Sequence, residues 1–379
     1  MPKTLDADAV HEALTLVNDP EINRPITDLG MVKSIDINKS GAVDVGIYLT
    51  VEGCPMKTTI TERVVDAVMK VPGVSKVAVQ LDVMSDDQRA ELKRTLRGHD
   101  QRDIPFTQPG STTKIFAIAS GKGGVGKSSV TASLAVLLAQ RGLAVGLLDA
   151  DVYGHSIPRI LGVTAPPTMV EGMLMPPQAY GVRFISMLPF KPGGVETPVA
   201  FRGPMLHRAL EQFLTDVWWG DLDVLLLDLP PGTGDIAIST AQLLPNAELI
   251  VVTTPQAGAA DVAVRSGTLA SQTHQKVLGV VENMSSFPCP HCGEPLDLFG
   301  VGGGTLVAEK LSEALGTTVP VLGRIPFDPE LREGGDSGDP LVVQRPDAAA
   351  SLALADIAAS LASRPRGLTG MQLGVTPVR

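Results

Sequence analysis

The sequence GKGGVGKS at residues 121–128 decides the fold, because it has the spacing of a phosphate-binding loop. The preceding segment KIFAIA, residues 114–119, is apolar and β-branched, as a buried strand is. The following segment, SSVTASLAVLLAQRG, begins at Ser128 and has the spacing of a helix that ends at Gly142. A strand, a glycine-rich turn and a helix in this order are the context in which such a loop binds nucleotide phosphates.

The residue types of the loop suit the charge of a triphosphate. Glycines let the backbone turn its N–H groups inward, and the helix N-terminus adds roughly half a positive charge. Lys127 is placed to reach the β- and γ-phosphates of ATP, and the Ser128 hydroxyl to bind Mg²⁺. We therefore predict that the nucleotide is bound by Gly121, Lys122, Gly123, Gly124, Val125, Gly126, Lys127, Ser128 and Ser129.

Composition excludes several classes of protein. The chain of 379 residues is 44% hydrophobic, enough for a large core, and has a formal net charge of -10. An acidic chain with no cluster of Lys and Arg argues against nucleic acid as a partner. The N-terminus lacks the apolar core of a signal peptide, and no run of about 18 apolar residues occurs. We expect a soluble, cytoplasmic protein with no membrane partner.

The first part of the chain, residues 1–92, is predicted to form a small α+β domain. Its expected elements are a helix at 6–17, strands at 31–37 and 42–50, a helix at 57–71 and a strand at 74–84. Residues 93–113 are polar, contain two prolines and lack periodicity, as a linker does.

The second part, residues 114–363, has the pattern of an α/β domain. Helical stretches alternate with apolar runs at 144–149, 182–187, 223–228, 248–254, 277–283 and 319–326. Such runs predict a P-loop NTPase fold, a mostly parallel sheet covered by helices on both faces. The ligand should lie at the carboxyl ends of the strands, where the phosphate-binding loop also lies. Residues 364–379 show no helical stripe and are predicted to be disordered.

Lys122 is a second lysine in the loop, and at this spacing it would point away from its own nucleotide. A loop with this lysine resembles the deviant P-loop family that includes MinD, ParA, the arsenite-pump ATPase and nitrogenase iron protein. There the lysine reaches across a dimer to the partner's phosphates. The resemblance implies an ATPase that forms an ATP-bound homodimer, with Lys122 acting in trans beside the catalytic Lys127 and Asp151. Asn283 matches the family position that hydrogen-bonds adenine. The alternatives are a solvated lysine and a turn asparagine.

Two strand ends carry aspartates that suit metal-assisted phosphoryl transfer. LLDADVYGHSIPRILG, residues 147–162, resembles the switch I segment of the deviant family, where Asp151 corresponds to the residue that orients the attacking water and Asp149 lies near Mg²⁺. LLLDLPPGTGD, residues 225–235, is typical of a Walker-B strand running into a switch II loop, and Asp228 would hold a water of the Mg²⁺ shell. The alternative is that each aspartate caps a turn or a helix.

Three cysteines are too few for a disulfide framework, so each is a candidate site. Cys289 and Cys292 form a Cys-x-x-Cys pair followed by Gly293, with spacing suited to zinc or to an iron-sulfur cluster. Either metal usually takes four protein ligands, and a twofold axis through this loop would join two pairs into one four-thiolate site. A redox pair is a third option, although Gly293 and Pro295 argue against the helix that such a motif opens.

Several segments together point to one branch of the deviant family. DADVYGHSIP, FRGPM at 201–205, DLPPGTGD and CPHCG resemble the Mrp/ApbC branch, the ATP-dependent iron-sulfur cluster carriers. The resemblance covers residues 114 to about 360. It implies that Cys289 and Cys292 of two subunits hold a labile [4Fe-4S] cluster across the homodimer, and that the cluster comes from a donor and passes to apo-proteins.

The first part of the chain has a resemblance of its own. NDPEINRPITDLGMV at 18–32 with LTVEGCPM at 49–56 resembles the small domain of cytosolic iron-sulfur assembly factors, in which a cysteine follows a strand and opens a helix. A helix N-terminus stabilises a thiolate. Cys54 would then be a transient metal ligand or a contact for recipients; the alternative is a buried, inert cysteine.

Two other functions stay open from the sequence. A positioning ATPase of the MinD/ParA type would bind a membrane or DNA, and it needs a basic amphipathic helix or a basic surface that the sequence does not show. An ATP-regulated interaction module with structural zinc would use the same cysteine pair.

Overall fold

The computed structural model describes residues 5–20, 22, 24–50, 56–97, 103–108, 110–151, 154, 156–163, 165–170, 172–186, 203–273, 275–289 and 291–364. The chain divides into two compact units, one of residues 1–102 with 168–175 and one of residues 103–167 with 176–379. Cys54 and residues 365–379 of the predicted disordered tail, which was expected to begin at Arg364, lie outside the described residues.

The first unit contains a three-stranded sheet covered by helices. Its elements are α1 (Ala7–Leu14), β1 (Val32–Ile37), β2 (Ala42–Leu49), α2 (Lys57–Val68), β3 (Lys76–Val83) and α3 (Asp86–Arg97). The strand order is β1-β2-β3, with β1 antiparallel and β3 parallel to β2. Alternate residues of β2 enter the core, where Val43, Val45, Ile47 and Leu49 are at most 4% exposed. The predicted small α+β domain is therefore confirmed.

Helix α3 was not predicted from the sequence. Its segment DDQRAELKRTLR is strongly polar and carries no wide apolar stripe, so periodicity alone indicates a linker. Gln, Arg, Glu, Leu and Lys nevertheless have high intrinsic helix propensity, which accounts for a helix at this point.

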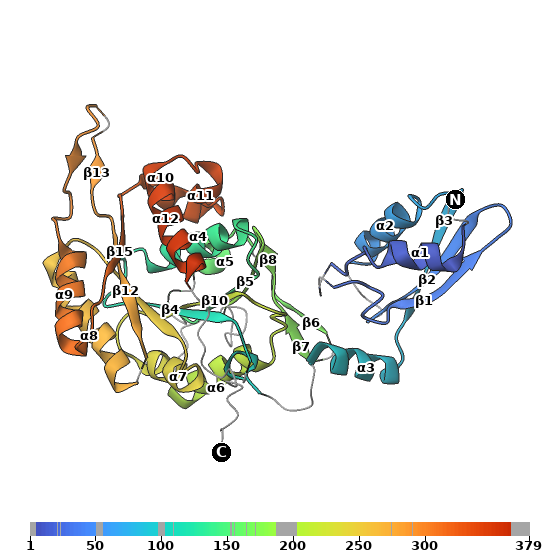
Figure 1. Cartoon of the computed structure of the whole chain (residues 1–379), viewed down its shortest axis with the longest axis horizontal. Helices are drawn as coiled ribbons and strands as arrows, with labels where there is room; N and C mark the ends of the chain where they lie inside the picture. Colours follow the sequence, from blue (N-terminus) through green and yellow to red (C-terminus); the bar gives the residue numbers. More distant parts are fainter. Residues whose placement is uncertain are drawn as a thin grey trace, which may run out of the picture. The chain divides into compact units, whose positions relative to one another are not determined.

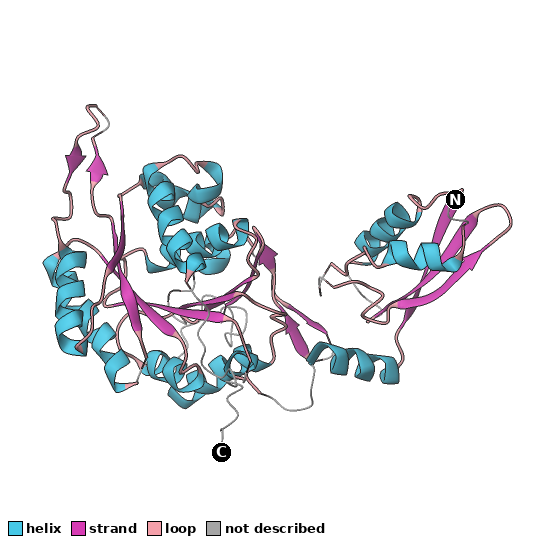
Figure 2. Cartoon of the chain, viewed as in Figure 1, coloured by secondary structure: helices cyan, strands magenta, loops and turns pink. Residues whose placement is uncertain are grey.

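The second unit is built on an eight-stranded sheet of order β15-β12-β11-β4-β10-β5-β9-β8 (Figures 1 and 2). Each predicted strand is present, and the bounds are β4 (Lys114–Ser120), β5 (Val145–Asp149), β9 (Val182–Ser186), β10 (Val224–Asp228), β11 (Glu248–Thr253), β12 (Val277–Asn283) and β15 (Val321–Ile325). These strands pair in parallel, and only the short edge strand β8 (Gln178–Ala179) runs antiparallel to its neighbour. The predicted P-loop NTPase fold is confirmed.

Helices cover both faces of this sheet (Figure 1). One face carries α4 (Lys127–Gln140), α5 (Ile157–Ile160), α10 (Pro329–Ser337), α11 (Leu341–Gln344) and α12 (Ala349–Ser363). The other carries α6 (Gly203–Thr215), α7 (Asp235–Leu243), α8 (Ala257–Gln272) and α9 (Gly303–Leu315). Among the described helices, none combines the length and the apolar character that crossing a membrane requires.

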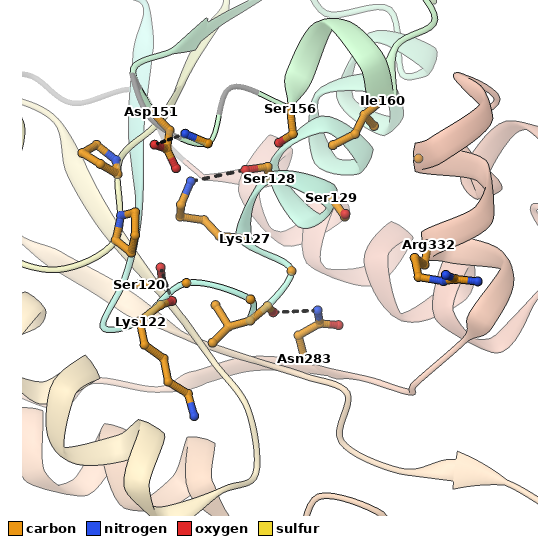
Figure 3. Close-up of a pocket in the computed structure, with 18 of the residues that line it drawn as sticks. Ser120, Lys122, Lys127, Ser128, Ser129, Asp151, Ser156, Ile160, Asn283 and Arg332 are labelled. Carbon is orange, nitrogen blue, oxygen red and sulfur yellow. Dashed lines mark hydrogen bonds between the residues drawn. The ribbon is translucent and has the colours of Figure 1, made fainter. Parts of the chain in front are cut away.

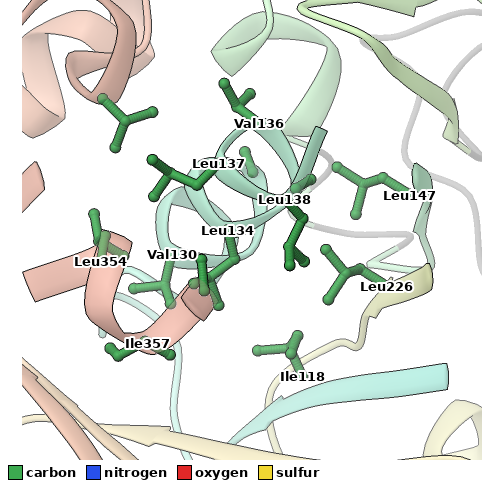
Figure 4. Packing of buried hydrophobic residues seen from close by; sticks show 14 of the residues in the cluster. Ile118, Val130, Leu134, Val136, Leu137, Leu138, Leu147, Leu226, Leu354 and Ile357 are labelled. Atoms are coloured by element: carbon green, nitrogen blue, oxygen red, sulfur yellow. The ribbon is translucent and has the colours of Figure 1, made fainter. Parts of the chain in front are cut away.

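The core of the second unit is centred on α4. Figure 4 shows Leu134 and Leu138 of this helix close to Leu226 of the sheet and to Ile357 of α12. Because α4 lies between the sheet and α12, it is buried on almost every side, and Leu134 is fully buried. This packing fixes the start of α4, and with it the loop at residues 121–126.

Short elements complete the unit. Residues 103–108 lie in the segment predicted as a linker, yet here the 3-10 turn η1 (Pro105–Thr107) packs on the second unit. The Phe106 ring meets Trp219 edge-on at 6.5 Å, and the Asn246 side-chain amide donates to the Phe106 carbonyl at 3.2 Å. The sequence did not predict the hairpin of β13 (Phe287–Pro288) with β14 (Pro295–Leu296) in this unit. It also did not predict the hairpin of β6 (Thr168–Val170) with β7 (Met173–Met175), whose residues belong to the first unit.

Candidate functional site

The loop between β4 and α4 has the backbone of a phosphate cradle. Gly124 and Gly126 have φ of 80° and 77°, in the left-handed region that favours glycine. A Cβ at Gly123 or Gly124 would meet nothing within 4 Å, so the loop faces open space, whereas a Cβ at Gly121 would overlap the backbone of α8. The loop ends at the N-terminus of α4, whose N–H groups and dipole favour a bound anion.

The loop borders a cavity of about 890 Å³. Of the residues predicted from the sequence, it is lined by Lys122, Gly123, Gly124, Val125, Gly126, Lys127, Ser128, Ser129, Asp151 and Asn283 (Figure 3). Gly121, Asp149 and Asp228 are not in the lining: the two aspartates are fully buried behind it. The cavity is large enough for a nucleotide, and its walls bring together most of the predicted nucleotide residues.

Three polar side chains at the base of the cavity contact the Asp228 carboxylate. This carboxylate lies 2.7 Å from the Lys127 ammonium and accepts hydrogen bonds from the Ser128 hydroxyl at 2.5 Å and the Thr131 hydroxyl at 2.8 Å. Since Thr131 is one helical turn beyond Lys127, the start of α4 supplies all three donors. Thr131 was missed from the sequence, because its position in the helix is typical of a core residue.

Asp149 lies beside Asp228 because β5 and β10 are parallel neighbours whose last residues pair directly. Burial, and next the charge of Asp228, raises the pKa of Asp149 to about 8; the Lys127 charge and a hydrogen bond from Ser186 at 3.1 Å act in the opposite direction. Two buried carboxylates beside a single lysine leave an excess of negative charge. Ser128 lines the cavity, and Asp228 and Asp149 lie directly behind it. Carboxylate and hydroxyl oxygens are the donors that Mg²⁺ prefers, so these three residues fit a magnesium site.

Asp151 follows β5 and is 7% exposed at the edge of the cavity. Its carboxylate accepts from the Gly154 N–H at 2.8 Å, and its own N–H donates to Asp149 at 3.2 Å. These two contacts hold the carboxylate toward the side where Lys127 lies (Figure 3). Val152, Tyr153 and His155 of the same predicted switch segment lie outside the described residues.

The Lys122 side chain leaves the cavity that its residue helps to line. Figure 3 shows it directed away from Lys127 and Ser128, and its ammonium donates to the Gln256 side chain at 3.0 Å. Gln256 precedes α8 and was not singled out from the sequence. The two lysines of the loop therefore point to different places within one chain.

Asn283 ends β12 and is 3% exposed. Its side-chain amide donates to the Val125 carbonyl at 2.9 Å, and a Cβ at Gly126 would overlap it. From the end of β12, the Asn283 side chain therefore stabilises the conformation of the phosphate-binding loop. Its contact with adenine stays a prediction.

The far wall of the cavity was missed from the sequence. It is formed by Met284, by residues after β15, and by one side of α5 and of α10, and includes Arg159, Ile160, Pro326, Phe327, Asp328, Leu331 and Arg332. The segment IPFDP at 325–329 carries a signal that could have found it, because a proline and an aspartate directly after a buried strand resemble the other strand ends of the site.

Cys289 and Cys292 lie at the tip of the hairpin formed by β13 and β14, which projects from the sheet beyond β12 and β15 (Figure 1). The Cys289 N–H donates to the Glu294 carbonyl, and the Gly293 N–H donates to the Cys289 carbonyl, both at 2.8 Å. Gly293 has φ of 77°, as a tight turn requires. Cys289 is half-buried and Cys292 is exposed.

The turn directs hydrogen-bond donors at the Cys289 sulfur. The N–H groups of Cys292 and His291, and then the Cys292 thiol, lower the pKa of the Cys289 thiol. A thiolate is the form that binds metals. Within the described parts of the chain, no group of three or more His, Cys, Asp or Glu residues could hold a metal, so the pair has no third ligand beside it there.

Family comparisons match both units of the chain. Residues 111–362 match the family described as NUBPL iron-transfer P-loop NTPase, and residues 7–81 match the family described as iron-sulfur cluster assembly protein.

Individual relatives are similar over most of the chain. An iron-sulfur cluster carrier protein of Mycobacterium bovis is 60% identical over 384 residues, which span 100% of both chains. One of Deinococcus radiodurans is 41% identical and covers 94% of this chain and 95% of its own. Among solved structures, a nucleotide-binding protein of Archaeoglobus fulgidus in complex with ADP is 33% identical, with a TM-score of 0.52, and covers 66% of this chain and 96% of that one.

Proposed function

We propose a mechanism from the premise that this chain belongs to the NUBPL iron-transfer P-loop NTPase family and is an iron-sulfur cluster carrier. The family resemblances predicted from the sequence are confirmed for both parts of the chain. The carried cluster is [4Fe-4S], held as cargo by Cys289 and Cys292 of two copies of the chain, and ATP binding and hydrolysis control its capture and release. The observation that supports this most directly is the cysteine hairpin: its N–H groups stabilise a thiolate, and it follows β12 of the sheet that carries the nucleotide cavity.

Nucleotide hydrolysis would use the residues at the base of the cavity. Lys127 and the N–H groups of the loop would hold the phosphates, and Ser128, Asp228 and Asp149 would hold Mg²⁺. The metal ion would neutralise negative charge on the phosphates during hydrolysis. Asp151 orients the attacking water, since its carboxylate is fixed at the cavity edge by the Gly154 N–H.

Lys122 would complete the site of a second copy. Its side chain already points out of its own cavity, toward Gln256, and a cation donated in trans stabilises the charge of phosphoryl transfer. We propose a twofold homodimer in which Lys122 of each copy reaches the nucleotide site of the other copy.

The same homodimer would complete the cluster site. A [4Fe-4S] cluster takes four thiolates, and each hairpin offers two. Cys292 is exposed and Cys289 is half-buried, so the sulfurs are open to a second hairpin and to the partners of a carrier, a cluster donor and apo-protein recipients. The first unit, with Cys54, would serve these partners as an accessory domain.

Anaerobic reconstitution with iron and sulfide tests the proposal. We expect about four irons and four sulfides per dimer in the wild type, and loss of both in Cys289→Ala and in Cys292→Ala. Cys54→Ala is the matched control and should retain the cluster, and all variants should bind ADP. Zinc as the only bound metal, or a full cluster in Cys289→Ala, would overturn the proposal.

A further inference from the structure

Phe327 touches both the nucleotide cavity and the cysteine hairpin. It follows β15 and lines the cavity between Pro326 and Asp328. Its ring packs edge-on against Phe287 at 5.8 Å and against Phe299 at 5.7 Å, with interplanar angles of 65° in both pairs. Phe287 stands two residues before Cys289, and Phe299 follows the second strand of the hairpin. One side chain thus contacts both legs of the hairpin from the cavity wall.

The backbone ties the same segments together. Asn283 pairs with Ile325 at the end of the parallel ladder of β12 and β15. The ladder then continues beyond the strands, because the Ser285 N–H donates to the Ile325 carbonyl at 2.9 Å and the Phe327 N–H donates to the Ser286 carbonyl at 2.6 Å. A displacement of residues 325–327 is therefore transmitted to the first leg of the hairpin.

The joint between the sheet and this leg has an unusual backbone. Met284 has φ of 58°, in the left-handed region that non-glycine residues seldom adopt, and it lines the cavity. It stands between Asn283, which is bonded to Val125 of the phosphate-binding loop, and Ser285, which is bonded to Ile325. Strained backbone persists only where its surroundings fix it, and it often marks a segment that changes state.

The second leg of the hairpin is anchored to the same strand. Glu282, whose side chain is 3% exposed, accepts from the Gly304 N–H at the start of α9 and lies 3.5 Å from the Arg324 guanidinium. The segment of residues 285–302 therefore starts just after β12, and the residues that follow it bind back to β12 through Gly304 and Glu282. Between these two anchors, the ring contacts of Phe287 and Phe299 with Phe327 join the hairpin to the cavity wall.

We propose that the aromatic cluster of Phe287, Phe299 and Phe327 couples the nucleotide cavity to the cysteine hairpin, so that a bound nucleotide and a bound cluster change each other's affinity. Phe327 acts as a positioning residue at the centre of this cluster. The inference rests on the proposed carrier function, and it places the coupling at the wall formed by residues 326–328 rather than in the glycine-rich segment after Asp228. Such coupling is reciprocal, so it is measurable from the nucleotide side alone.

Phe287→Leu is the variant that separates coupling from binding. Phe287 does not line the cavity and carries no thiol, and leucine keeps an apolar side chain while removing the ring. Phe287→Tyr keeps an aromatic ring at this position, so it should retain the coupling that Phe287→Leu weakens. Phe184→Leu is the matched control, because Phe184 is a buried ring in β9, outside the cluster and the cavity lining.

The measurement is the dissociation constant for ADP with cluster-free and with cluster-loaded protein. We expect the ratio of the two constants to differ from one in the wild type, Phe287→Tyr and Phe184→Leu. In Phe287→Leu it should move toward one by roughly two- to tenfold, the range that one aromatic pair supplies. The visible circular dichroism of the cluster should likewise respond to ADP in the wild type and respond less in Phe287→Leu.

Other results would overturn the inference. A ratio of the two ADP dissociation constants equal to one in the wild type, or an unchanged ratio in Phe287→Leu, would refute the coupling but not the carrier function. Iron and sulfide contents near zero in the wild type remove the carrier function itself, and the inference with it. If Phe287→Leu fails to fold, Phe299→Leu tests the same ring contact from the other leg, and an unchanged ratio there has the same meaning.

Discussion

Replacing Asp149 by asparagine tests the electrostatics at the base of the cavity. Asp149 is fully buried beside Asp228, accepts from the Ser186 hydroxyl, and has its pKa raised to about 8. In the protein without nucleotide or metal it should therefore hold a proton at neutral pH. Asparagine has nearly the same shape and cannot titrate, so Asp149→Asn isolates the contribution of this proton.

The expected magnitude follows from linkage. The folded pKa is raised above the unfolded value of about 3.9, so the stabilisation is complete below that value and is lost as the pH rises to about 8. Between about pH 5 and 7 the folded chain holds one more proton at this site than the unfolded chain. The slope is then about 1.4 kcal/mol per pH unit, so the wild type should lose roughly 2.7 kcal/mol relative to Asp149→Asn over these two units.

Urea unfolding in the presence of EDTA measures this difference. The chain has 2 tryptophans, Trp218 and Trp219, and both belong to the second unit, so their fluorescence follows that unit alone. The free energy of unfolding is compared for the two proteins at pH 5, 6 and 7. Groups that titrate identically in both proteins cancel in the difference.

Parallel stability curves would refute the reasoning. A difference between wild type and Asp149→Asn that stays constant within about 0.5 kcal/mol would mean that Asp149 is already ionised in the folded protein at pH 5. The excess of buried negative charge inferred beside Lys127 would then be compensated by some other group.

Three further predictions concern the loop, the core and the dimer. Gly126→Ala places a Cβ against the Asn283 amide at a backbone φ of 77°. The free energy of unfolding should fall by more than about 1 kcal/mol, and ADP binding measured by calorimetry should weaken. Unchanged ADP binding would contradict the cradle geometry. Leu134→Ala removes a fully buried side chain between the sheet and α12, so urea unfolding should show a loss of about 2–5 kcal/mol, and a loss below 1 kcal/mol would mean that the site repacks. Lys122→Ala and Asp151→Ala should each abolish ATP turnover. In an equal mixture of the two variants, half of the dimers are mixed, and each mixed dimer has one complete site out of two, so roughly a quarter of wild-type turnover should return. No recovery from freely exchanging subunits would argue against catalysis in trans.

The sequence predicts the sheet of the second unit well for a physical reason. Parallel strands buried on both faces have near-continuous apolar runs, so Val224–Asp228 and Glu248–Thr253 stand out from their surroundings. The strand ends then place Asp149 and Asp228 at one edge of the sheet, since carboxyl ends of parallel strands share one edge. That the two are direct neighbours follows from the pairing of β5 with β10 in the structure.

What the sequence did not predict depends on contacts between distant segments. The ring of Phe327 meets Phe287, 40 positions earlier in the numbering, only because β12 and β15 are neighbours in the sheet. The bond from Asn283 to the Val125 carbonyl likewise joins segments 158 residues apart. Helix α3 was missed for a different reason, since its stability as a helix does not show as an apolar stripe.

The end of β12 shows how one strand can serve two sites. Successive side chains of a strand point to opposite faces of the sheet. Asn283 accordingly reaches the phosphate-binding loop at the start of α4, while Glu282 reaches Gly304 at the start of α9 on the other face. A shift of β12 by one residue would exchange the two faces and break both contacts at once. The register of this strand against β11 and β15 therefore holds the nucleotide loop and the anchor of the cysteine hairpin in a fixed relation. We accordingly expect ligand-driven movement in the segments beyond the strand ends, residues 284–287 and 326–328.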